Sequence, residues 1–158
     1  MKRTLMTLLL PFALAACGAG AVNYGGAATP SSPSASATIS AGGSSLGQIL
    51  VDGNGKTLYL FEADTSTKST CSGACAQAWP PLTTIDAPKA AGNVSPSLLG
   101  TTTRTDGTTQ VTYNSHPLYF FVSDSKPGDT NGEGSTAFGA GWDVLSPTGD
   151  KIEKPGSY

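Results

Sequence analysis

The stretch Lys56-Thr-Leu-Tyr-Leu-Phe-Glu-Ala-Asp64 returns later in the chain as His116-Pro-Leu-Tyr-Phe-Phe-Val-Ser-Asp124. Three residues recur at a constant offset of 60: Tyr59, Phe61 and Asp64 in the first copy become Tyr119, Phe121 and Asp124 in the second. Each copy is followed by a tryptophan and a leucine, which recur at an offset of 63 as Trp79 and Leu82, then Trp142 and Leu145. Two copies with the same sequel indicate an internally duplicated unit, with repeats at about 46–85 and about 109–147.

The residues around both copies have the pattern of β-strands. Leu46 to Val51 and Thr57 to Glu62 flank an Asp-Gly-Asn-Gly turn, which predicts a hairpin. A second hairpin is expected at 101–105 and 109–113, around an Asp-Gly turn. No long stretch has a 3.6-residue apolar period, so helix should be scarce, with Ser72 to Ala78 as the best short candidate.

Alternation inside the motif predicts how its strands are covered. Tyr59 and Phe61 fall on one face of their strand and Leu58 and Leu60 on the other, so neither face is polar. Strands of this kind are covered on both sides. We therefore predict an all-β fold with little helix: a small two-layer or barrel-like antiparallel β domain built from two pseudo-symmetric repeats.

The N-terminal segment reads as an export signal. Lys2 and Arg3 precede an apolar run, and Leu-Ala-Ala-Cys17 resembles the lipobox of bacterial lipoproteins, in which the cysteine receives lipid. We predict a signal peptide at 1–16, a lipidated cysteine with a flexible Gly/Ala/Ser/Pro tether at 17–43, and one β domain at 44–158. The expected location is the cell envelope, and Gly18 after the cysteine favours the outer membrane in a Gram-negative organism.

Charge and composition exclude several classes of partner. The net charge is −2, and loss of Lys2 and Arg3 makes it −4, because all eleven acidic residues lie downstream. Such a chain lacks the basic surface of a nucleic-acid-binding protein. The expected partners are the membrane, through the lipid on Cys17, and an unknown envelope protein or small ligand. No cofactor is expected.

The two remaining cysteines, Cys71 and Cys75, are predicted to form a disulfide, because an even residual pair in an exported protein usually does. A redox-active pair is the alternative. The C-x3-C spacing differs from that of thioredoxin-like motifs, and no histidine follows Cys75 as haem attachment would require.

The chain resembles a known family, the predicted bacterial lipoproteins defined by a repeated Y-x-[FWY]-x-x-D motif. This family is also called the secreted repeat of unknown function. The resemblance covers Ile49 to Gly149 and is carried by the two motif copies, Cys71-Ser-Gly-Ala-Cys75, Trp79-Pro-Pro-Leu82 and Pro127-Gly-Asp-Thr-Asn-Gly-Glu-Gly134. Two departures are Asp143, where an aromatic or hydrophobic residue is expected, and Ser115, where the family usually has glycine. The resemblance implies an envelope location and a two-copy β unit, and it assigns no activity.

Other candidate sites each have two interpretations. Asp64 and Asp124 could form a symmetric pair of ligand-binding carboxylates, but aspartates that end strands usually accept N–H bonds from the following turn. Tyr59 and Tyr119 could present hydroxyls to a ligand, but tyrosines on such strands usually belong to the core.

The segment 129–133 is a candidate metal site with two interpretations. The segment from Asp129 through Asn131 to Glu133 partly resembles the start of a calcium loop, yet Ala140 stands where the bidentate carboxylate would be needed, so a solvated acidic turn is expected. His116 is the only histidine and is expected in an exposed turn. We predict no metal centre and no catalytic residues.

Three functions follow in order of support. The first is a non-enzymatic, lipid-anchored binding or scaffolding module, favoured by the anchor, the tether and the shortage of catalytic groups. The second is a periplasmic or cell-surface redox accessory protein, suggested by the cysteine pair and the clustered tyrosine and tryptophan. The third is a carboxylate-based hydrolase using Asp64 and Asp124.

Overall fold

The computed structural model describes residues 35–153, so the predicted signal peptide, Cys17 and most of the predicted tether lie outside the described residues. The elements are, in chain order, β1 (Thr38–Ser44), β2 (Gly47–Asp52), β3 (Tyr59–Phe61), α1 (Ala74–Ala78), β4 (Lys89–Ala90), β5 (Leu99–Thr103), β6 (Thr109–Tyr113), β7 (His116–Pro117), β8 (Trp142–Leu145) and β9 (Lys151–Ile152), with 3-10 helices at Pro96–Leu98 and Ala137–Gly139. No helix within 35–153 is long and apolar enough to cross a membrane.

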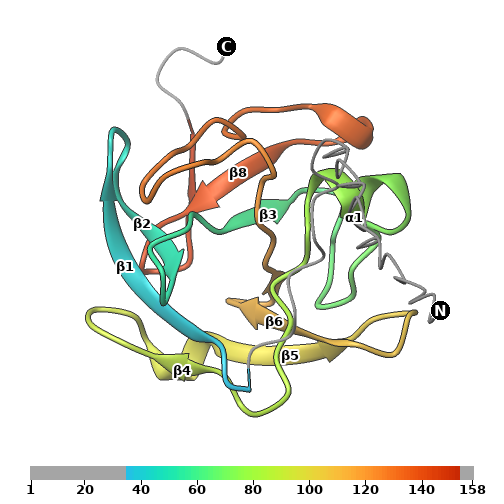
Figure 1. Ribbon diagram of the computed structural model, residues 1–158, viewed down its shortest axis with the longest axis horizontal. Helices are drawn as coiled ribbons and strands as arrows, with labels where there is room; N and C mark the ends of the chain where they lie inside the picture. The colour runs from blue at the N-terminus through green and yellow to red at the C-terminus, as the bar shows by residue number, and fades with distance from the viewer. Residues whose placement is uncertain (1–34, 154–158) are drawn as a thin grey trace, which may run out of the picture.

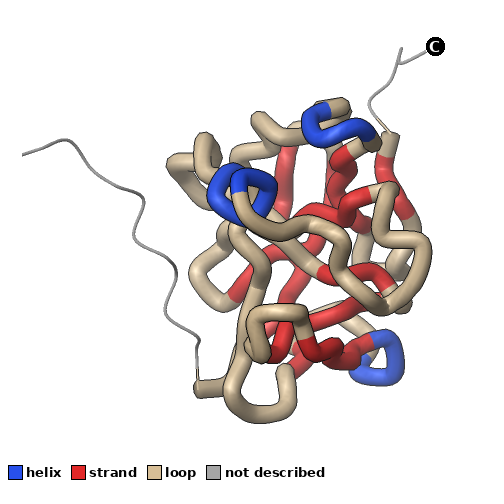
Figure 2. The backbone as a smooth tube through the Cα atoms, turned by 90° about the vertical axis from the view of Figure 1, so that its right-hand side faces the viewer, coloured by secondary structure: helices blue, strands red, loops and turns tan. Residues whose placement is uncertain are grey.

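The strands form three small sheets, ordered β2-β1-β4, β3-β8-β9 and β5-β6-β7. Every pair is antiparallel except the short parallel contact of β1 with β4. Figure 1 shows β1 and β2 along one side, β8 along a second side and β5 with β6 along a third, with β3 between them. Strands cross the interior while helices and long loops lie outside (Figure 2). The expectation of an all-β fold with little helix is confirmed, with its strands in three small sheets.

The domain begins earlier than the sequence suggested. The predicted tether extended to residue 43, but β1 pairs with β2 from Ile39↔Asp52 to Ser44↔Gly47. Ala37 and Ile39 are buried, and a Cβ on Gly42 would lie 2.8 Å from Val51 Cγ1. The small residues that looked like a flexible linker therefore also permit close strand packing, and the predicted boundary at residue 44 is wrong.

The first predicted hairpin is also corrected. β2 pairs with β1, and one isolated bridge, Val51↔Thr57, joins β2 to the next segment. The following strand, β3, turns away to pair with β8. The second hairpin, β5 with β6, forms as predicted.

The core has two layers, as the alternation predicted. Leu58 and Leu60 belong to one buried cluster, together with Leu118 and Phe120. Tyr59 and Phe61 face the other cluster, which also contains Tyr119 and both tryptophans. The motif strands thus separate two apolar layers, and their tyrosines lie fully inside one of them.

Candidate functional site

The two motif strands meet at their tyrosines. The backbone N–H of Tyr59 donates to the carbonyl of Tyr119 at 2.9 Å, and the N–H of Tyr119 donates to the carbonyl of Tyr59 at 3.0 Å. This reciprocal antiparallel bridge places a pseudo-two-fold axis between the two residues. Each repeat therefore meets its counterpart at the same position of the motif.

The motif segment of each repeat also pairs with the W-x-x-L segment of the other repeat. Tyr59 pairs with Val144 of the second repeat, while Tyr119 pairs with Pro81 of the first. Pro81 and Val144 are related by the same offset of 63 as the tryptophans. Each Y-x-F segment is therefore hydrogen-bonded to the W-x-x-L segment of the other repeat.

The tyrosine of each repeat likewise forms a hydrogen bond with the aspartate of the other repeat. The Tyr59 hydroxyl donates to Asp124 Oδ2 at 2.7 Å, and the Tyr119 hydroxyl donates to Asp64 Oδ2 at 2.5 Å. Burial raises the pKa of both phenols well above the usual range, and the hydrogen bonds to the aspartates raise it further. Both tyrosines are therefore neutral donors across the physiological range.

The second oxygen of each aspartate holds the turn that follows the motif. Asp64 Oδ1 accepts bonds from the N–H and hydroxyl of Thr70, at 2.7 and 2.6 Å. Asp124 Oδ1 accepts bonds from the backbone and side-chain nitrogens of Asn131, at 3.0 and 3.1 Å. The interpretation of the aspartates as turn acceptors is confirmed, and their link to the tyrosine of the other repeat was not anticipated.

Four aromatic rings stack on the same axis. The two tryptophan rings are parallel, with centroids 3.9 Å apart. Phe61 stacks on Trp142 at 4.1 Å, and Phe121 stacks on Trp79 at 4.3 Å. The core assignment holds for the tyrosines, the tryptophans and Phe61, whereas Phe121 is only half-buried.

The predicted disulfide between Cys71 and Cys75 is present, with a Cα–Cα distance of 5.3 Å. It is buried at the start of α1, and the N–H of Trp79 at the end of that helix donates to the carbonyl of Cys75. The bridge therefore lies directly before the segment that carries Trp79 into the stack.

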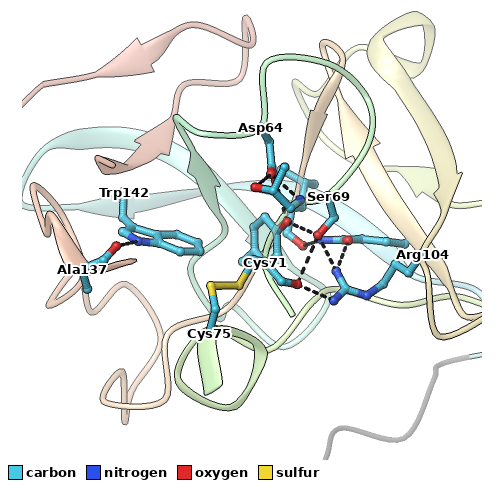
Figure 3. Close-up of a disulfide and its surroundings, with 11 residues drawn as sticks. Asp64, Ser69, Cys71, Cys75, Arg104, Ala137 and Trp142 are labelled. Atoms are coloured by element: carbon cyan, nitrogen blue, oxygen red, sulfur yellow. Dashed lines mark hydrogen bonds between the residues drawn. A yellow bond between two sulfur atoms is a disulfide. The ribbon is translucent and has the colours of Figure 1, made fainter. Parts of the chain in front are cut away.

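A buried arginine beside the disulfide was missed in the sequence (Figure 3). Arg104 donates to Gln110 Oε1 and to the Cys71 carbonyl, both at 2.6 Å, and to Ser69 Oγ at 2.8 Å. Ser69 Oγ in turn lies 2.7 Å from the Tyr119 hydroxyl. The available signal was its spacing, because Arg104 directly follows β5 and lies two residues after Thr102, which is buried as well.

The acidic turn departs from the expectation at one residue. Asp129 Oδ2 accepts the N–H groups of Ser125 and Lys126 at exposed positions, and Asn131 is exposed and bonds to Asp124. Glu133, by contrast, is 8% exposed and accepts the Val144 N–H at 2.8 Å. The exposed position expected for Glu133 is therefore wrong. No three metal-binding side chains lie together anywhere in the described part of the chain.

A pocket of about 410 Å³ lies between the loop after β3 and the β6–β7 turn. Its lining residues are Leu60, Glu62, Asp64, Thr65, Ser66, Asn114, Ser115, His116 and Lys151. His116 lies in β7 and is half-buried rather than in an exposed turn. Desolvation lowers the pKa of its imidazole, and the nearby negative charge of Asp64 opposes this shift only in part. The ring is therefore held largely neutral.

Asp143, one of the two departures from the family pattern, is a buried carboxylate whose replacement should change stability. It is 7% exposed, its Oδ2 lies 4.0 Å from Lys151 Nζ, and desolvation raises its pKa above the ordinary 3.8. A raised folded pKa stabilises the fold at low pH, and this contribution is lost as the pH rises through the folded pKa. Asp143→Asn should therefore stabilise the protein at pH 7 by about 0.5–2 kcal/mol. In urea melts across pH the gain should vanish below the ordinary pKa, and a pH-independent effect would contradict this account.

Comparison with known proteins places these features in a family. No curated protein and no solved structure matches the chain. A family model described as a secreted repeat of unknown function matches residues 41–83 and 100–146, which together make up more than half of the chain. The two matched segments contain both motif copies and both tryptophans, the residues that meet on the pseudo-two-fold axis. The chain therefore belongs to the family of secreted repeats of unknown function.

Proposed function

We propose that this protein is a lipid-anchored, non-enzymatic binding module of the bacterial cell envelope. The family is described as secreted, and Leu-Ala-Ala-Cys17 supplies an acceptor for lipid. A diacylglyceryl group plus an amide-linked chain such as palmitate anchors stably where a single chain does not. Gly18 favours the outer membrane if the organism has one.

The distribution of polar groups supports binding over catalysis. Both oxygens of Asp64 and of Asp124 already bind the framework, which leaves the hydrolase hypothesis without a free carboxylate pair. In the pocket, by contrast, neither the His116 ring nor the Ser115 hydroxyl forms a hydrogen bond to any described residue. A volume of about 410 Å³ is within the range of small-molecule sites. These groups suit a small polar ligand that both donates and accepts hydrogen bonds.

The backbone of Ser115 is the observation that carries the proposal. Asn114 and Ser115 have φ values of 48° and 69°, so the β6–β7 turn holds two non-glycine residues in the left-handed region. Glycine adopts this conformation at lower cost than serine. Strain of this kind concentrates at functional sites. The two-residue turn between β6 and β7 itself requires positive φ at both positions. A serine in place of glycine there adds a hydroxyl at the pocket, which supports binding of a polar ligand.

Ser115→Gly should raise the free energy of unfolding of the unliganded protein by about 1 kcal/mol, because it relieves the left-handed serine. It should also weaken ligand binding. Thermal melts with amino acids, monosaccharides and polyols would identify ligands, which stabilise only the form that binds them. His116→Ala is the second pocket variant, and Asn54→Ala, in an exposed turn of the first repeat, is the control. The binding proposal fails if no compound stabilises the protein, or if stabilisation is unchanged in both pocket variants.

Cys17→Ser should release the protein from membranes, because it removes the lipid acceptor. Globomycin, which blocks lipoprotein signal cleavage, should trap the uncut wild-type form. The measurement is the fraction of protein that sediments with membranes after a high-salt wash. A serine variant that still sediments would rule out Cys17 as the sole anchor.

A further inference from the structure

The stacked rings and the paired phenols together have the geometry of an electron-transfer site, independently of any ligand in the pocket. We propose that Trp79 and Trp142 act as a one-electron relay: the pair loses an electron to a radical oxidant and regains it from Tyr59 or Tyr119, whose phenol proton passes to Asp124 or Asp64.

Ring contacts supply the electron path. The two indoles are parallel within 6°, with centroids 3.9 Å apart. We expect rings in this geometry to share the positive charge that remains when one of them loses an electron. Tyr59 meets Trp79 edge to face at 5.3 Å, and Tyr119 meets Trp142 in the same way at 5.2 Å. Each tryptophan therefore has a tyrosine in van der Waals contact, and an electron crosses no gap between donor and acceptor.

The aspartates supply the proton path. A phenol that loses an electron becomes a strong acid, and both phenols are fully buried, so water cannot take the proton. Leaving a charged phenol in an apolar interior would be costly. Asp124 Oδ2 and Asp64 Oδ2 already accept the two phenol hydrogens, at 2.7 and 2.5 Å. Each proton thus needs to move only along an existing hydrogen bond.

The step balances in atoms and charge. An oxygen- or nitrogen-centred radical at the surface takes one electron from the buried indole pair across the half-buried Phe121 ring, which stacks on Trp79. The radical becomes the corresponding anion. Tyr59 returns one electron to the indole radical cation, and its proton moves to the Asp124 carboxylate. The products are neutral indoles, a neutral phenoxyl radical and a neutral carboxylic acid. The same step can run from Tyr119 to Asp64.

Pulse radiolysis with the azide radical, which oxidises tryptophan preferentially, tests the relay. The sample is the exported full chain carrying Cys17→Ser, with Tyr24 and Tyr158 replaced by phenylalanine. Tyr59, Tyr113 and Tyr119 are then its only tyrosines, and Trp79 and Trp142 are its only tryptophans. The tryptophanyl absorption should decay as the tyrosyl absorption grows, at a first-order rate that does not depend on protein concentration.

Matched variants assign the path. Tyr113 is fully buried, but it donates to the Pro147 carbonyl and belongs to the other core layer. Tyr113→Phe should leave the transfer unchanged, whereas Tyr59→Phe combined with Tyr119→Phe should abolish it. Asp64→Asn and Asp124→Asn keep an acceptor oxygen but not a base, and should each slow their own branch. If the double variant does not fold, each single phenylalanine variant should lower the tyrosyl yield without abolishing it. Transfer that persists in the double variant, a tyrosyl yield unchanged in both single variants, or a rate that rises with protein concentration would overturn the proposal.

Discussion

Replacing Trp142 with alanine should lower the free energy of unfolding by about 3–5 kcal/mol, the usual cost of truncating a fully buried large aromatic residue. Trp142 is 0% exposed and touches Trp79, Phe61 and Tyr119 through their rings. Its indole N–H also donates to the Ala137 carbonyl at 2.8 Å. The substitution opens a cavity at the contact between the repeats, where no single repeat can repack to fill it.

Urea unfolding of the wild type and the variant measures this effect. Phe138→Ala is the control, because Phe138 is 51% exposed in the same region of the chain, and its loss should change stability by less than about 1 kcal/mol. An effect of Trp142→Ala no larger than that of the control would mean that the stack is not the centre of the fold. A domain of this size has a total stability of about 5–15 kcal/mol, so the variant should be close to unfolding.

Asp64→Ala should cost at least about 3 kcal/mol, because one carboxylate accepts three hydrogen bonds and bonds to charged groups are each worth about 1.5–3 kcal/mol. The change leaves the buried Tyr119 phenol without its acceptor and releases the turn at Thr70. Asp52→Ala is the matched control. The Asp52 carboxylate also accepts three bonds, from the Asn54 and Lys56 N–H groups and the Asn54 side chain, but all three are exposed and none comes from a phenol. The larger cost at Asp64 therefore follows from burial and from the Tyr119 bond.

The comparison separates two roles of the aspartate. If holding the following turn were its whole contribution, Asp64→Ala and Asp52→Ala would cost similar amounts, about 1 kcal/mol. We expect Asp64→Ala to exceed this by the value of the buried bond to Tyr119. Equal urea midpoints for the two variants would contradict the exchange of tyrosine and aspartate between repeats.

The duplicated motif and its alternation were enough to predict the fold class and the two core layers. Alternation along a strand depends on local geometry, so Leu58 and Tyr59 could be assigned to opposite faces from the sequence alone. The early start of the domain could not, because Gly42 reads as flexible until Val51 is known to lie against it. Small residues are compatible with both a linker and a tightly packed strand.

The candidate site was predicted residue by residue but not as an arrangement. Tyr59 and Asp124 are 65 positions apart, and nothing in either copy shows which aspartate each tyrosine would reach. Arg104 was missed because a lone arginine in a threonine-rich segment looks like a solvated turn residue, whereas its partners come from Ser69, Cys71 and Gln110. Glu133 was likewise predicted to be exposed, because its hydrogen-bond partner, the Val144 N–H of β8, lies 11 residues away in the sequence.

A pair of double-mutant cycles tests the exchange between repeats most directly. One cycle combines Tyr59→Phe with Asp124→Ala, residues of different repeats that share a hydrogen bond of 2.7 Å. The other combines Tyr59→Phe with Asp64→Ala, residues of the same repeat whose side chains share no bond. Urea unfolding should give a coupling energy of about 1–3 kcal/mol for the first cycle and less than about 0.5 kcal/mol for the second. Coupling within the repeat equal to or larger than coupling between the repeats would contradict the account.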